Sequence, residues 1–136
     1  LVDAAGVMGQ RIFFPPNVKG WDGGRAWINT STLFTRQNIV LYLLTGRQPG
    51  EAAWDTSLDL YDATHLLDHL ADDRGEIDVD DGVTWLMRFA LGGEPRQDEA
   101  RAQITTFVNE HGRRFTNEVL IGSLALISGM PEYQLC

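Results

Sequence analysis

Apolar residues recur three or four positions apart along most of the chain, and short segments containing Gly or Pro separate these stretches. The spacing predicts about six helices, at about 1–10, from Thr30 to Gly46, at about 57–71 and 79–91, from Pro95 to Gly112, and from Thr116 to Gly129. No stretch of useful length alternates between apolar and polar residues as a strand would. The chain is therefore predicted to be all-α, an irregular bundle of helices joined by short turns.

The helix that begins near Thr30 is the most apolar of these elements. Asn29, Thr30 and Ser31 are all favourable N-cap residues, and past position 38 apolar side chains surround almost the whole helix. A helix that is apolar on every side needs neighbours that cover it. We therefore expect this helix to be the central, buried element.

The later helices carry clear start signals. Asp78 is the predicted N-cap of the helix at 79–91, and Asp80 and Asp81 lie in its first turn, where the helix dipole favours acidic side chains. Thr116 is the predicted N-cap of the last helix. The side chains expected to face inward are Val79, Val83, Leu86, Ala90, Ala100, Ile104, Phe107, Val108, Val119, Leu120, Ser123, Leu124 and Ile127.

The segment 15–29 is too rich in Gly and Pro for a helix or a strand, yet it contains Trp21 and Trp27. Two indoles favour a loop that is folded onto the rest of the protein, because a solvated linker would leave them exposed. We expect a long ordered loop, with the apolar residues 12–14 plugged into the core.

Ligand binding is the alternative interpretation of this loop. Trp21 or Trp27 would stack on a sugar or an aromatic ring, and Asp22 with Arg25 would bind its polar groups. Arg36 follows closely, and we expect it to hold loop carbonyls or pair with an acid rather than act in catalysis. The candidate ligand-binding residues are Asn17, Trp21, Asp22, Arg25, Trp27 and Arg36.

The predicted helix at 57–71 places Asp62, His65 and His69 opposite its apolar stripe. Their spacing has the outline of an inverted zincin helix, with Asp where Glu is expected. Because the sequence places no further ligand, we predict no metal site and no cofactor, and keep these residues as the alternative metal candidate. The acidic run 72–81 does not fit a calcium-binding loop, because Gly75 sets a register that puts Arg74 at a ligand position.

Charge and cysteine content narrow the possible partners. Nineteen acidic and 11 basic residues give a formal net charge of −8, which disfavours nucleic acid and anionic membrane surfaces. The longest apolar run, 39–44, is far shorter than the roughly 20 residues that span a bilayer, so no membrane insertion is predicted. Cys136 is the only cysteine, so no internal disulfide can form.

Part of the chain resembles a known family. Residues 8–10, 14–21, 23–29 and 31–33, together with Arg36 and Asn38, are similar to the C-terminal part of the bacterial domain of unknown function family 1800. The chain end, Pro131-Glu132-Tyr133-Gln134, resembles the family again. The resemblance implies no catalytic residues. Because the family is longer and the chain starts inside a helical stretch, we expect a C-terminal fragment of a longer protein.

Two hypotheses on function follow. In the first, residues 1–136 form a single helical domain, a structural or interaction module whose partner is the rest of its own chain or another protein. In the second, the chain is part of a carbohydrate-active or hydrolytic enzyme with a pocket lined by the Trp21–Trp27 loop. The sequence contains no recognisable acid/base pair of carboxylates, so it leaves catalysis open. It also leaves the compartment and the oligomeric state open.

Overall fold

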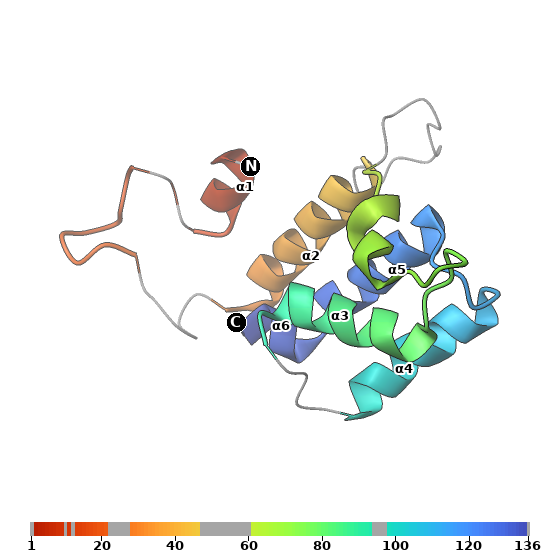
Figure 1. Cartoon of the computed structure of the whole chain (residues 1–136). Helices are drawn as coiled ribbons and strands as arrows, with labels where there is room; N and C mark the ends of the chain where they lie inside the picture. Colours follow the sequence, from red (N-terminus) through yellow and green to blue (C-terminus); the bar gives the residue numbers. More distant parts are fainter. Residues whose placement is uncertain are drawn as a thin grey trace. The chain divides into compact units, whose positions relative to one another are not determined.

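The computed structural model describes residues 2–9, 11, 13–21, 28–46, 61–93 and 98–135. In these residues every regular element is helical, which confirms the predicted all-α class (Figure 1). Contacts divide the chain into two compact units, Leu1–Asp59 (unit 1) and Leu60–Cys136 (unit 2). The prediction of a single domain over 1–136 stays a prediction.

Unit 1 contains α1 (Val2–Val7), which packs against α2 (Thr30–Thr45). Asn29 begins α2 as predicted, because its side chain accepts from the Thr32 N–H at 3.1 Å while Thr32 Oγ1 accepts from the Asn29 N–H at 2.9 Å. Gly46 ends the helix in a left-handed conformation, and its N–H donates to the Tyr42 carbonyl. Both ends of the second predicted helix are thus confirmed.

The burial of α2 differs from the expectation. All sixteen residues of α2 are described, and only Thr32 among them is buried, while Phe34 and Leu43 are 66% and 53% exposed. The helix is apolar around its circumference, and the six-residue α1 can cover only one side of it. The prediction that this helix is the central, buried element is therefore wrong for this structure.

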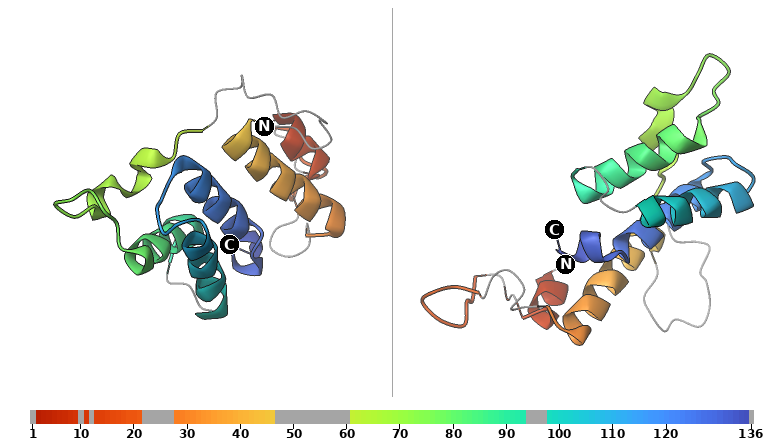
Figure 2. Two further views of the ribbon diagram at one scale, coloured as in Figure 1. Left: turned by 90° about the vertical axis from the view of Figure 1, so that its right-hand side faces the viewer. Right: turned by 90° about the horizontal axis from the view of Figure 1, so that it is seen from below.

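The buried core lies in unit 2 instead. Here η2 (Thr64–Leu70, a 3₁₀-helix), α3 (Val79–Leu91), α4 (Asp98–Glu110), α5 (Asn117–Ser128) and α6 (Pro131–Leu135) follow one another. The helices α3, α4 and α5 pack on one another, and η2 and α6 contact α3 (Figures 1 and 2). The largest fully buried apolar side chains are Leu67, Val83, Leu86, Met87, Ile104, Val108, Leu120 and Ile127.

The ends of α3 and α5 agree with the predicted signals. Asp78 Oδ1 accepts from the N–H groups of Asp80 and Asp81, and Thr116 Oγ1 accepts from the Val119 N–H. The inward face predicted for α5 is buried throughout. The apolar pattern predicts that Ala90 of α3 faces inward, but Ala90 is only half-buried. Met87, which the predicted set does not include, is buried instead.

Two glycines allow aromatic rings to lie directly on helix backbones. A Cβ added at Gly82 of α3 would meet Phe115 Cε2 at 2.5 Å, and one added at Gly122 of α5 would meet Phe107 Cζ at 2.6 Å. Real side chains do not approach this closely. Phe115 lies in the turn between α4 and α5, so these rings connect all three core helices.

The third predicted helix is shorter and wound differently from the expectation. Its part at 57–60 lies outside the described residues, and the rest forms the 3₁₀-helix η2. Asn117 Oδ1 accepts from the Ala63 N–H at 2.8 Å, and Asp62 Oδ1 accepts from the Thr64 N–H at 3.0 Å. Because these two N–H groups bond to side chains, a regular α-helix cannot run through this point.

Past α5 the chain forms a further short helix. Gly129 and Pro131 end α5 as predicted, and Pro131 then occupies the first turn of α6, where its missing N–H costs nothing. Gln134 Nε2 donates to the Ser128 carbonyl at 2.7 Å, which fastens α6 to the end of α5. Tyr133 of α6 is half-buried.

A search of the described helices for membrane spans finds none that is both long and apolar enough to cross a bilayer.

Gly82→Ala tests the ring-on-backbone packing. In an open helix this change stabilises by about 1 kcal/mol, but here the new methyl group overlaps Phe115, so we expect a loss of about 1–3 kcal/mol in the free energy of unfolding. Urea denaturation followed by circular dichroism measures it. Gly93→Ala is the control, because a Cβ there meets no atom within 4 Å. A gain in stability at Gly82 would contradict the packing.

Asn117→Ala tests the anchor of segment 61–63. The substitution leaves the N–H of fully buried Ala63 without its acceptor, so we expect a loss of about 1–3 kcal/mol in the free energy of unfolding. Amide hydrogen exchange should also speed up at Ala63. Asn109→Ala on the exposed side of α4 is the matched control and should leave both measurements nearly unchanged.

Candidate functional site

Of the six residues predicted to bind a ligand, Asn17, Trp21 and Arg36 are described, whereas Asp22, Arg25 and Trp27 lie outside the described residues. Asn17 closes a local turn, because its Oδ1 accepts from the Lys19 N–H at 2.8 Å and its carbonyl accepts from the Gly20 N–H at 3.0 Å. Arg36 is half-buried on α2. With half of the set undescribed, the predicted ligand site stays a prediction.

The apolar side chains of this segment do not reach a core. Phe13 and Phe14 are 88% and 69% exposed, Val18 is fully exposed, and Trp21 is 38% exposed. The expectation that residues 12–14 plug into the core is therefore wrong for Phe13 and Phe14, and residue 12 lies outside the described part. The physical reason is that the described residues of this segment close local turns, at 11–14 and 17–20, which fix the backbone without covering the side chains.

The side chains of the alternative metal candidate, Asp62, His65 and His69, do not converge on one point. Asp62 Oδ1 accepts from the N–H and the hydroxyl of Thr64, His65 Nδ1 lies 2.8 Å from Asp68 Oδ2, and the His69 ring lies 4.9 Å from that of Trp85. A 3₁₀-helix has about three residues per turn, so His65 and Asp68 share one row and His69 falls off it, while Asp62 lies before the helix begins. Across the described residues, no three His, Cys, Asp or Glu side chains are placed to hold a metal ion.

These contacts change two pKa values. The hydrogen bonds from Thr64 lower the pKa of Asp62. The hydrogen bond and the charge of Asp68 raise the pKa of His65. Both groups are exposed to solvent, so the shifts describe local hydrogen bonding and carry no indication of catalysis.

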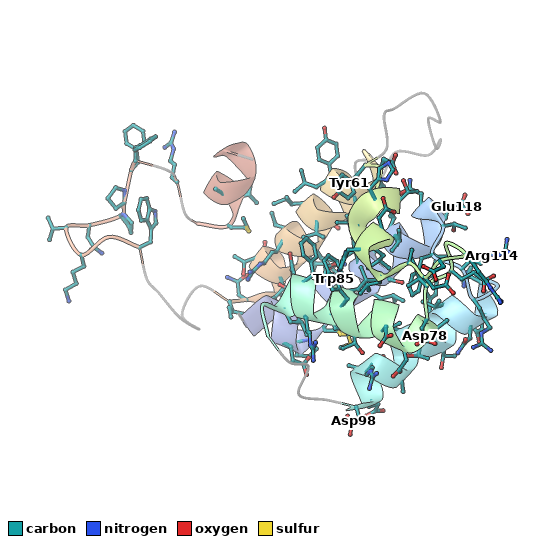
Figure 3. All side chains as sticks on the ribbon, in the orientation of Figure 1. Tyr61, Asp78, Trp85, Asp98, Arg114 and Glu118 are labelled. Carbon is teal, nitrogen blue, oxygen red and sulfur yellow. The ribbon has the colours of Figure 1, made fainter. Side chains whose placement is uncertain are left out.

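A cleft of about 1020 Å³, which the sequence did not indicate, lies in unit 2 between the turn that precedes α3 and the turn that precedes α5. Figure 3 labels Asp78 and Arg114, one from each turn. The lining consists of three arginines, four carboxylates and several small or apolar residues: Leu70, Asp72, Arg74, Gly75, Glu76, Ile77, Asp78, Val79, Asp81, Gly112, Arg113, Arg114, Phe115 and Thr116.

Two of the four carboxylates in the cleft serve the backbone. Asp72 Oδ1 accepts from the N–H groups of Arg74 and Glu76, which closes the turn before α3, and Asp78 is the N-cap of α3. The side chains of Glu76 and Asp81 make no hydrogen bond or ion pair with any residue that the structure describes. The acidic run 72–81 signals one wall of this cleft, but the arginines of the other wall lie about forty positions later, too far for a local motif.

A separate ion pair joins α3 to α4. Arg101 Nη2 lies 2.6 Å from Asp80 Oδ2 and donates to Thr84 Oγ1 at 2.9 Å. Arg101 belongs to α4, whereas Asp80 and Thr84 lie one turn apart on α3. This contact crosses the helix pair and is part of the packing of the unit.

Comparison with known protein families shows to which family the chain belongs. A family described as a protein of unknown function, DUF1800, matches residues 1–135, which is nearly the whole chain. The chain therefore belongs to this family of proteins of unknown function, as its residues at 8–38 and at 131–134 had suggested. No curated protein and no solved structure matches it.

The His65–Asp68 contact gives a pH-dependent prediction. We expect His65 to titrate above its ordinary pKa, and Asp68→Asn to return it toward that value, as measured by NMR of the imidazole protons. Because the folded-state pKa is raised, the pair contributes its stability fully below the unfolded pKa and loses it as the pH rises through the folded pKa. Asp73→Asn is the control. An unchanged titration in Asp68→Asn would show that the contact is absent in solution.

Proposed function

We propose that this chain is a helical interaction module, and that unit 1 binds an apolar surface of a protein. The observation that carries the proposal is the exposure of large apolar side chains on two described parts of unit 1. They are Phe13, Phe14, Val18 and Trp21 in the turn segment and Phe34, Tyr42 and Leu43 on α2.

This exposure exceeds what scattered surface residues explain. Single exposed apolar residues are normal on any protein, but several Phe, Tyr and Trp side chains gathered on two short elements are typical of a binding surface. Burial of one Phe side chain contributes about 1.5–3 kcal/mol, so even a few of them could hold a stable complex. An apolar helix such as α2 gains stability when a partner covers the side chains that it exposes to solvent.

The charges of the turn segment indicate the complementary surface. Residues 11–21 contain Arg11 and Lys19 and no acidic residue, although the whole chain has a net charge of −8. The guanidinium of Arg11 lies over the Phe14 ring, 5.5 Å from its centroid, so a cation and an apolar ring are presented together. The surface that fits is apolar with acidic residues around it, on the remainder of the same polypeptide or on a separate protein.

Site-specific photo-crosslinking tests this proposal. A photoreactive phenylalanine analogue at Phe14 or Phe34 of the full-length protein, expressed in its own cells, should form adducts with a defined protein surface. Phe34→Ser should weaken that association by about tenfold or more, because an apolar contact is lost. The same analogue at Phe89, which is 57% exposed on α3 of unit 2, is the control and should form few adducts. Equal adduct yields at Phe34 and Phe89, or none at Phe14 and Phe34, would contradict the proposal.

A further inference from the structure

The cleft in unit 2 collects basic residues from an acidic part of the chain. Over residues 60–136, acidic residues outnumber basic ones by 14 to 6. Three of those six basic residues, Arg74, Arg113 and Arg114, line the cleft, although they come from two turns far apart in the sequence. Arg113 and Arg114 are neighbours in the sequence, and the packing of the two turns brings Arg74 to the same concave site.

The arginine side chains are available to a ligand. Within the residues that the structure describes, the guanidinium groups of Arg74, Arg113 and Arg114 make no hydrogen bond or ion pair, whereas the guanidinium of Arg101 is engaged by Asp80 and Thr84. The backbone that carries Arg113 is fixed, because its N–H donates to the Val108 carbonyl at 3.1 Å and its φ is 59°. A guanidinium presents several N–H donors in a planar fork, which binds a carboxylate or a phosphate through paired hydrogen bonds.

The remaining lining restricts the ligand further. Glu76 and Asp81 offer carboxylate oxygens that can only accept hydrogen bonds, and Leu70, Ile77 and Phe115 offer apolar surface. A bare anion would gain from the arginines but meet these carboxylates, and a polycation would meet the three arginines. A molecule that joins one anionic group to several hydroxyl donors and an apolar C–H face satisfies all three kinds of lining.

We infer that the cleft binds an anionic sugar, that is, a sugar ring that carries a carboxylate or a phosphate group. The arginines bind the oxyanion, Glu76 and Asp81 accept from ring hydroxyls, and the apolar residues contact the C–H face. The cleft volume of about 1020 Å³ accommodates a ligand of this size with room for more than one ring. The inference concerns unit 2 and does not rest on the interaction surface proposed for unit 1.

Isothermal titration calorimetry of the intact chain tests the ligand class with four probes: glucuronate, glucose 6-phosphate, glucose and inorganic phosphate. We expect heat of binding at millimolar concentration for glucuronate, glucose 6-phosphate or both, and the comparison between them tells a carboxylate from a phosphate ligand. Glucose and inorganic phosphate should bind at least about tenfold more weakly, because each lacks one of the two matching groups. Raising the salt concentration should weaken the charged probes.

Variants locate the binding in the cleft. Arg114→Gln should weaken the charged probe by about tenfold, and Glu76→Ala should weaken it through the lost hydroxyl acceptor. Arg114 is chosen over Arg113 because the positive φ of Arg113 would mix a backbone effect into the result. Arg88→Gln removes the same charge on the exposed side of α3, outside the cleft lining, and should leave affinity unchanged. Circular dichroism confirms that each variant is folded.

Four results would overturn the inference: no binding of either charged sugar, equal binding of glucose, equal binding of inorganic phosphate, or unchanged affinity in folded Arg114→Gln. Equal binding of glucose would show that the anionic group is not recognised, and equal binding of inorganic phosphate would show that the hydroxyls are not. Unchanged affinity in Arg114→Gln would show that the ligand binds outside the cleft.

Discussion

Two phenylalanine rings lie on two helix backbones, and the core of unit 2 is arranged around these contacts. Phe115 covers Gly82 of α3, and Phe107 of α4 covers Gly122 of α5, at separations that no Cβ would permit. The absence of a side chain at each glycine lets a ring fill space that would otherwise separate the helices. Because Phe115 lies in the turn before α5, the same contact also holds in place one wall of the cleft.

The cleft shows how the capping of helices can build a site. Asp78 and Thr116 begin α3 and α5, and the turns that lead to these two caps form the opposite walls. Each cap satisfies backbone N–H groups at its helix start, so the neighbouring side chains are left to project from an ordered backbone. Arg114 projects from such a turn on one wall of the cleft, and Glu76 projects from the other turn on the opposite wall.

The two units use their apolar residues differently. Unit 2 buries side chains from η2, α3, α4 and α5 in one core, and its few large exposed apolar residues are scattered. Within the described residues of unit 1, α2 packs against the six-residue α1, and the turn segment closes local turns by backbone hydrogen bonds. Hydrophobic stabilisation scales with the apolar area removed from water, so a partner that covers unit 1 would contribute what this unit does not supply for itself. The large exposed apolar side chains that form a group therefore lie in unit 1, and the cleft lies in unit 2.

The local pattern of residues determined most of the helices and their ends. Asn29, Asp78 and Thr116 act within three residues of their own positions, and the apolar stripes of α3 and α5 follow the helical period, so these features could be predicted without the fold. Family membership was also visible in the sequence, in residues 8–38 and 131–134. Only the tertiary structure decided where η2 begins, because Asn117, more than fifty residues away, accepts from the Ala63 N–H, and it also decided the exposure of Phe13, Phe14 and α2. It also decided the meeting of Arg74 with Arg113 and Arg114, because no local period relates residues that come together only when α3, α4 and α5 have packed.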